Sequence, residues 1–332
     1  MKRNSIAVAL VAACLAILPF AVMNDFYIGL ASQILIYALF ALSINLLVGF
    51  GGMVSLGHAV YLGITAYACV LLVDRAGLDQ FSAAIASLLI ATLTAAGFGV
   101  LALRAAGLGF LMITLALGQI VWGVAYRWVD ITGGDNGLGL SHRPAPFGLD
   151  LSNPTSFYYF TLVVFAVSTF CIWRLVHSPF GASLMGTRDQ PRRMSTLGHH
   201  VWMIRWVTFG LAGFWAAVPG LLFIYYHKFV SPYVVSLQQS AEGLLMAILG
   251  GASTFAGPVV GAVIITLVKN VASTYVERWN ALLGAIFVLV VLFMPRGIVP
   301  GVQEWWRRLP GRHVEPVSGA STDKKRMARP VS

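Results

Sequence analysis

A stretch of 48 residues, from Phe26 to Val73, contains no Asp, Glu, Lys or Arg. A helix needs only about 20 residues to cross a hydrocarbon core about 30 Å thick, so this stretch is too long for a single crossing. The glycine-rich sequence Gly49-Phe50-Gly51-Gly52 divides it. The stretch therefore predicts two consecutive membrane-spanning helices, at about 28–48 and 54–73.

The composition of the whole chain agrees with this interpretation. Of 332 residues, 58% are hydrophobic and 10% are charged, against about 25% charged in an average soluble domain. These values exclude a disordered chain, a coiled coil and an ordinary soluble enzyme. The apolar runs are continuous rather than alternating, so we expect helices and not barrel strands. The predicted fold class is an all-α polytopic membrane protein.

Further apolar runs predict additional crossings at about 5–23, 81–103, 107–127, 157–176 and 206–226. The apolar region from Ser231 to Pro295 is interrupted by glycines and accommodates either two crossings or three. In the second case the three lie at about 234–250, 257–276 and 281–296. The total is therefore nine or ten.

The distribution of basic residues favours ten crossings. Lys2 and Arg3 precede the first run, the segment 177–205 carries four arginines, and the tail 296–332 carries eight Lys or Arg. Basic segments are retained in the cytoplasm. All three are cytoplasmic only if the number of crossings is even. Seven of the 12 acidic residues then lie in outer loops, so the net charge of +10 reflects topology and not nucleic-acid binding.

The first run has an alternative interpretation. Val11-Ala12-Ala13-Cys14 comes after a basic start and resembles a lipoprotein cleavage box. The apolar run continues to Met23, however, where a cleaved lipoprotein would become polar. We therefore expect an uncleaved first crossing.

Several kinds of chemistry have no motif in this sequence. There is no GxxxxGK[ST] loop for ATP, no HExxH, no GxSxG and no paired-cysteine motif. We therefore expect no cofactor, no metal site and no catalytic residues. An ion-coupled secondary transporter usually needs buried carboxylates, and Glu242 is the only acid within a predicted crossing. This alternative and a membrane-embedded enzyme are both disfavoured.

Four segments, taken in order, resemble the permease subunits of bacterial branched-chain amino-acid ABC transporters. They are Ala41–Gly49 running into Gly52-Met53-Val54-Ser55-Leu56-Gly57-His58-Ala59, Gly109–Ala116 with Thr132–Leu138, Ser178–Gly181 with Arg188-Asp189 and Leu197-Gly198, and Leu249–Gly251 with Gly257–Ala262. The chain is most similar to the permease with an extra N-terminal crossing. Gln119 stands where many relatives carry an acid, and Gln190-Pro191-Arg192-Arg193 replaces a commoner acidic sequence.

The resemblance implies an importer subunit in the bacterial inner membrane, with leucine, isoleucine and valine as substrates. Its implied partners are a second homologous permease, two cytoplasmic ATP-binding subunits and a periplasmic substrate-binding protein, within the membrane lipid. Specificity would rest largely with the binding protein. Urea, amides and other amino or aromatic acids therefore stay open as substrates.

The segment 177–205 is the only long cytoplasmic loop in the ten-crossing topology. By resemblance it is the element that couples the permease to the ATPases, through Arg188, Asp189, Leu197 and Gly198. A short helix that ends at Gly198 suits this role, because glycine adopts the left-handed conformation that stops a helix. The alternative is an ordinary basic loop. The predicted domains are a permease domain, 1–309, and a disordered basic tail, 310–332.

Two glycine-broken segments, 49–57 and 250–258, occur in corresponding halves of the chain. Paired interruptions of this kind point to an inverted repeat with broken helices and a substrate pathway. The candidate pathway residues are Ser55, Gly57, His58, Thr114, Gln119, Gly251 and Gly257. The alternative for the glycines is close helix packing, and for His58 a hydrogen bond to a neighbouring helix.

Glu242 and Lys269 lie in consecutive crossings of opposite direction. Counted from a turn near Thr254, their depths differ by roughly 5 Å at about 1.5 Å per residue. Since an isolated charge in the bilayer is costly, we expect an ion pair in the outward half of the membrane. The alternative is that each side chain reaches the interface separately.

The topology is testable with reporter fusions. Reporters at Ser332 and near Arg192 should be cytoplasmic, and a reporter near Asn136 should be periplasmic, because ten crossings place both termini inside. A periplasmic Ser332 would exclude the ten-crossing count.

Overall fold

The computed structural model describes residues 24–140, 151, 153–275 and 297–302, together with the isolated positions 15, 19, 281, 284, 285, 288, 289 and 292. The main helices are α2 (Asp25–Asn45), α3 (Ala59–Asp74), α4 (Gln80–Ala102), α5 (Leu108–Arg127), α7 (Pro154–Val176), α10 (Val201–His227), α11 (Leu237–Gly250) and α12 (Ala256–Tyr275). Shorter elements are η1 (Leu46–Phe50), α6 (Val129–Thr132), η2 (Gly134–Asn136), α8 (Pro179–Asp189), α9 (Pro191–Thr196) and η4 (Pro232–Val235), with two strands, β1 (Leu138–Gly139) and β2 (Phe229–Val230).

Helix α2 is the central helix of the bundle. It is apolar on every side, and from Leu35 to Asn45 every side chain is buried, as expected of a helix surrounded by others. It contacts α7, α10, α11 and α12. The side-chain oxygen of Asn24 accepts a hydrogen bond from the backbone N–H of Phe26 and caps the helix. Helix α2 then continues into the π-helical turn η1, which ends at Phe50.

Helices α4, α5 and α7 lie at the edge of the described bundle and bury only one stripe each. In α4 this stripe repeats about every four residues and consists of small side chains: Ala83, Ser87, Ala91, Ala95, Gly99 and Ala102. Large apolar side chains such as Leu93 of α4 and Val163 of α7 are exposed. This arrangement suits helices that face lipid or another membrane subunit.

Five of the described helical spans are long and apolar enough to cross a membrane: 25–50, α4, α5, α7 and α10. Helices α3 and α12 are shorter apolar helices. These findings support a multi-pass all-α membrane protein, with a two-stranded β1–β2 sheet as a small addition. The predicted crossings at 5–23 and 281–296, the cleavage-box alternative and the tail 310–332 lie largely or wholly outside the described residues, so the count of ten stays a prediction.

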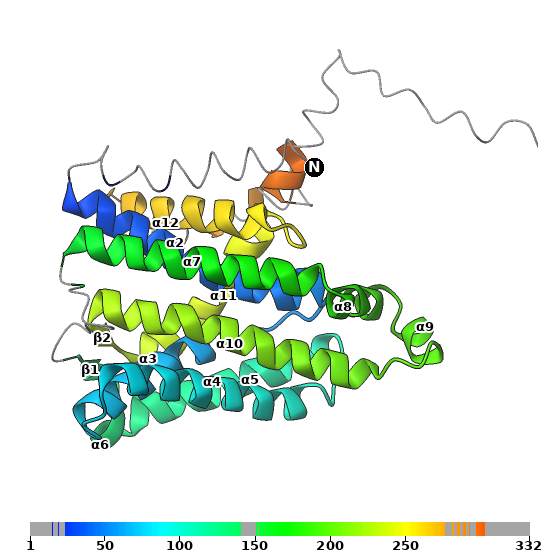
Figure 1. The fold of residues 1–332 in the computed structure, drawn as a ribbon, viewed down its shortest axis with the longest axis horizontal. Coiled ribbons are helices and arrows are strands. Elements are labelled where there is room, and N and C mark those ends of the chain that lie inside the picture. The colour runs from blue at the N-terminus through cyan, green and yellow to red at the C-terminus, as the bar shows by residue number, and fades with distance from the viewer. Residues whose placement is uncertain are drawn as a thin grey trace, which may run out of the picture.

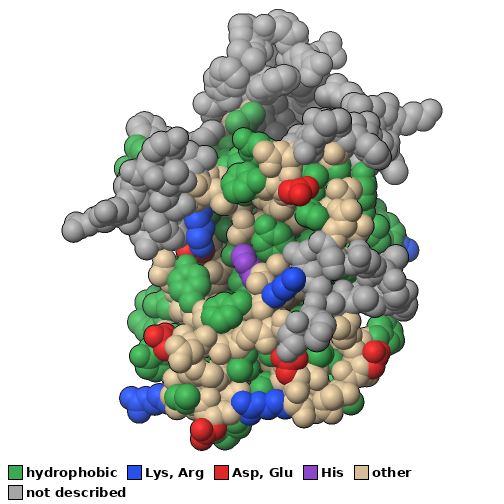
Figure 2. Space-filling model, turned by 90° about the vertical axis from the view of Figure 1, so that its left-hand side faces the viewer, with side chains coloured by type: hydrophobic (Ala, Val, Ile, Leu, Met, Phe, Trp, Pro, Cys, Tyr) green, Lys and Arg blue, Asp and Glu red, His purple; other side chains and the backbone are tan. Residues whose placement is uncertain are grey.

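The two ends of the bundle differ (Figure 1). One end carries α8 and α9, and the opposite end carries α6 and the antiparallel pairing of Leu138 with Val230. We call them the α8–α9 end and the β1–β2 end. Figure 2 shows the β1–β2 end, where acidic and basic side chains are spread among apolar ones. The loops predicted to be cytoplasmic and the loops predicted to be external thus occupy opposite ends.

The broken helices differ in part from the sequence prediction. The first predicted break is present, because residues 51–58 are mostly irregular before α3 begins at Ala59. The second glycine-broken segment, 250–258, is the turn between α11 and α12, as the predicted crossings at 234–250 and 257–276 require. In the second half, the segment 228–236, which contains β2 and η4, precedes the short helix α11. Pro232 lies within this segment, and the Ser236 hydroxyl caps α11 by accepting from the Gln239 N–H.

Candidate functional site

The irregular segment 51–58 is largely buried, and its hydrogen bonds come partly from the preceding turn η1 and partly from other helices. The Leu56 N–H donates to Thr114 Oγ1 on α5 at 3.3 Å. The Ala59 N–H donates to Ser240 Oγ on α11 at 3.1 Å. A buried backbone group without a partner is costly in a membrane, so these two side chains are what allow the chain to leave the helix here.

Three predicted pathway residues, Ser55, Gly57 and Thr114, are brought together in this region. Ser55 and Thr114 are buried. A side chain at Gly57 would collide with the Thr114 carbonyl oxygen, so the close approach of 51–58 to α5 requires glycine. Within this chain the three residues form a packed contact.

His58 is the last residue before α3 and is almost fully buried. Its Nε2 lies 3.1 Å from Ser43 Oγ on α2, and its ring packs edge-on against Tyr61 at 5.5 Å. The hydrogen bond to a neighbouring helix, one of the two roles expected for this histidine, is therefore present. Ser43 and Ser240 are contacts that no sequence pattern indicated.

Gln119 has a different environment from Thr114, although both are on α5. Thr114 is on the buried stripe, and Gln119 is exposed on the outer face. Gly251 and Gly257 lie at the α11–α12 turn, far in the sequence from α5. The predicted pathway residues thus occupy three places and not one.

The α11–α12 turn is fastened to the end of α2. The buried Asn45 side chain accepts from the Ser253 N–H at 3.0 Å and donates to the Thr254 carbonyl at 2.8 Å. The Ser253 hydroxyl donates to the Gly49 carbonyl at 2.6 Å. The two glycine-broken segments singled out in the sequence therefore meet each other at the α8–α9 end. Asn45 and Ser253 carry this contact, and no pattern around them signalled it.

Arg188, near the end of α8, joins this meeting point. Its Nη1 donates to the Gly49 carbonyl and to Ser253 Oγ, the latter at 3.1 Å. Its Nε lies 2.8 Å from Asp189 Oδ1, which orients the guanidinium. One side chain of the predicted coupling segment thus bonds to both η1 and the α11–α12 turn.

The second half of the predicted coupling segment is the short helix α9. Helix α9 ends at Thr196 with Leu197 as its cap, and Gly198 comes next with φ of +85°. Leu197 is 68% exposed. The segment 201–205, expected in the loop, belongs to α10, because α10 begins at Val201.

Glu242 and Lys269 form an ion pair between α11 and α12. Lys269 Nζ lies 2.9 Å from Glu242 Oε2, and the Tyr233 hydroxyl donates to Glu242 Oε1 at 3.1 Å. The Glu242 side chain is 4% exposed. This is the contact expected from the sequence, with Tyr233 as an additional partner that was not expected.

Charge reversal tests the importance of this pair. Glu242→Lys should reduce the amount of assembled protein severalfold, because removing one partner of a buried pair costs about 3–5 kcal/mol. Adding Lys269→Glu should recover part of the loss, as measured by membrane yield and thermal unfolding. Asp135→Lys, at an exposed position, is the matched control. A double variant no better than Glu242→Lys would show that the pairing does not matter.

The chain is similar to a known family of transport proteins along most of its length. Residues 26–292 match the family model described as branched-chain amino acid transport system / permease component. No solved structure is a significant match.

Three curated relatives illustrate the range of similarity. The high-affinity branched-chain amino acid transport system permease protein LivM of Escherichia coli K12 is 28% identical, covering 90% of this chain and 76% of the relative. The autoinducer 2 import system permease protein LsrC of Salmonella paratyphi A is 27% identical, covering 99% and 96%. The permease protein LivH of Escherichia coli K12 is 26% identical over 37% of this chain and 40% of the relative. Because the family model matches most of its length, this chain belongs to the branched-chain amino acid transport system permease family.

Proposed function

We propose that this chain is a membrane-spanning permease subunit of an ATP-driven importer for leucine, isoleucine and valine. The family and the similarity to LivM support the class and the substrate. The chain catalyses no covalent step in this proposal. It sits in a bacterial inner membrane with both termini in the cytoplasm, 1–309 forming the permease domain and 310–332 a disordered tail.

The partners are inferred from the missing ATP-binding loop and from the relatives. Since the chain has no such loop, hydrolysis needs two ATP-binding subunits in the cytoplasm. Since LivM and LivH are both permease components, the second permease is a homologous chain. A periplasmic binding protein delivers the substrate.

The observation that carries this proposal is the contact of Arg188 with Gly49 and Ser253. Helices α8 and α9 project from one end of the bundle (Figure 1). A displacement of α8 by an ATPase reaches η1 and the α11–α12 turn directly, because Arg188 bonds to both. An ordinary loop that merely joins two crossings needs no such contact.

A second substrate class is kept because of LsrC, whose name gives autoinducer 2 as its cargo. That relative aligns along nearly the whole chain. An importer of the same class for another small polar molecule is therefore the competing function. Purification from native membranes separates the two: co-purified subunits define the class, and the ligand of the binding protein defines the cargo.

Arg188→Ala should uncouple hydrolysis from transport. We expect uptake per ATP hydrolysed to fall at least about tenfold, because hydrogen bonds from a charged group contribute about 1.5–3 kcal/mol each. The measurement is leucine uptake and phosphate release in proteoliposomes that contain the whole complex. Arg104→Ala, at an exposed position outside the segment 177–205, is the matched control. Equal ratios in the two variants would contradict the coupling role of Arg188.

Gly198→Val should also uncouple transport, through strain in the backbone. A Cβ at this position would meet open space, so a loss arises from the positive φ and not from a collision. The complex should still assemble and bind ATP. Gly210→Ala is the matched control, since its surroundings are equally open and its φ is not positive. Unchanged uptake with Gly198→Val would count against this segment as the coupling element.

A further inference from the structure

The exposed side of α5 is mostly apolar, with Leu108, Met112 and Ile120 exposed, but it also carries two polar side chains. Helix α5 packs inward through Phe110, Thr114, Gly118 and Ala125. Its opposite side exposes Gln119 and, at the last turn, Arg127. An exposed glutamine is ordinary on a soluble helix, but α5 is one of the spans long and apolar enough to cross a membrane.

The depth of Gln119 makes the exposure informative. The residue is 11 positions after Leu108 and eight before Arg127, which is about 16 Å and about 12 Å along the helix axis. It therefore lies near the centre of a hydrocarbon core about 30 Å thick. Lipid tails offer no partner for an amide, and polar side chains at this depth usually face other protein or a water-filled cavity.

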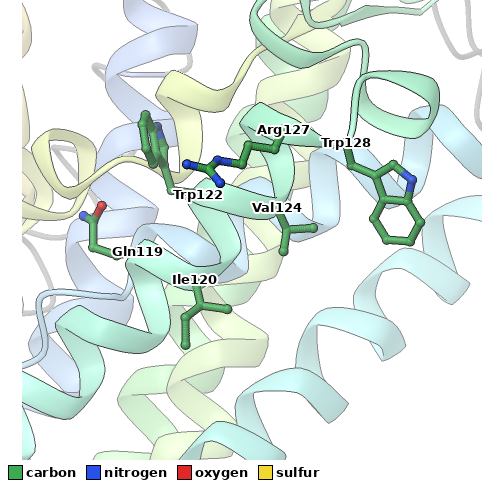
Figure 3. A pocket seen from close by; sticks show the side chains of 7 residues that line it. Gln119, Ile120, Trp122, Val124, Arg127 and Trp128 are labelled. Atoms are coloured by element: carbon green, nitrogen blue, oxygen red, sulfur yellow. The ribbon is translucent and has the colours of Figure 1, made fainter.

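A groove runs along the same part of α5 (Figure 3). Its volume is about 610 Å³, and all its lining residues lie between 119 and 128, on α5 or directly after it. Gln119, Trp122 and Arg127 extend to one side of the helix, and Ile120 and Val124 point away from them. The groove is open, as a groove that is completed by another subunit would be.

The three side chains suit a zwitterion with an apolar tail. The guanidinium of Arg127 matches the two oxygens of a carboxylate. The amide of Gln119 offers both a donor and an acceptor, and Trp122 provides an apolar surface between them. Gln119 and Arg127 are about 12 Å apart along the axis, and an extended residue spans only about 3.5 Å. They are therefore successive contacts and not a single site.

We propose that this groove lines the substrate path. In it Arg127 contacts the carboxylate of an apolar amino acid at the β1–β2 end, and Gln119 is the next polar contact towards the middle of the membrane. The proposal rests on the proposed function for its substrate, and the second permease closes the open side. The proposal assigns a transport role to Trp122 and Arg127, which no pattern in the sequence distinguished.

Thiol labelling tests whether the groove is aqueous. In the whole complex, with Cys14, Cys69 and Cys171 changed to alanine, Gln119→Cys should react with a membrane-impermeant thiol reagent. Leu93→Cys, near the middle of α4 and 70% exposed, is the matched control and should react at least about tenfold more slowly. An unreactive Gln119→Cys would show that this face is buried in lipid or against the partner, and the proposal would fail.

Transport tests the role of Arg127. Arg127→Gln should lower leucine uptake about tenfold or more while ATP hydrolysis stimulated by the loaded binding protein stays within about twofold, the loss expected for a charge-assisted hydrogen bond. Arg104→Gln, at an exposed position shortly before α5 begins, should change neither. Wild-type uptake with Arg127→Gln would overturn this contact.

The two experiments distinguish a failure of the proposed function from a failure of the groove proposal. If the wild-type complex imports no branched-chain amino acid, the substrate of the proposed function is wrong. The labelling of Gln119→Cys then still decides whether the groove is an aqueous path.

Discussion

The fold depends on the requirement that every buried backbone N–H and C=O find a partner within the protein. Residues 51–58 leave the helical conformation in the middle of an apolar bundle, and the Leu56 and Ala59 N–H groups find their partners on Thr114 and Ser240. These two hydrogen bonds join α3 to α5 and to α11. The same requirement gives two buried polar side chains, those of Thr114 and Ser240, a role in holding the backbone.

Much of the helical plan was predictable, because long uncharged runs leave few alternatives. The runs at 28–48, 81–103, 107–127 and 157–176 correspond closely to α2, α4, α5 and α7. The region 231–250 was harder. Its only signals for a break were Pro232 and the capping Ser236, and neither stands out in an apolar stretch without paired glycines. The turn at 250–258 was predicted, because glycines there separate two apolar runs, whereas the break at 228–236 was not.

Part of the candidate site was predictable from the sequence, but residues such as Ser240 and Ser253, and the arrangement of the site, were not. The pairing of Glu242 with Lys269 could be predicted from helix direction and depth, because an isolated charge inside the bilayer is costly. The contact of Arg188 with Gly49 and Ser253 could not be foreseen, since it joins residues 139 and 65 positions apart and ends on a carbonyl and a hydroxyl. Such partners have no sequence signature. The exposure of Gln119 likewise required knowing which stripe of α5 packs inward.

Around the π-helical turn Leu46–Phe50, the number of residues matters more than their identity. Asn45, at its start, and Ala59, after 51–58, are both fixed by hydrogen bonds to other helices. Loss or gain of one residue between them would rotate the next part of the chain by about 100° on a helix, and the Leu56 N–H would then point away from Thr114. The exposed side chain of Val54 is free to vary, whereas insertions and deletions between 46 and 58 should be absent among functional relatives.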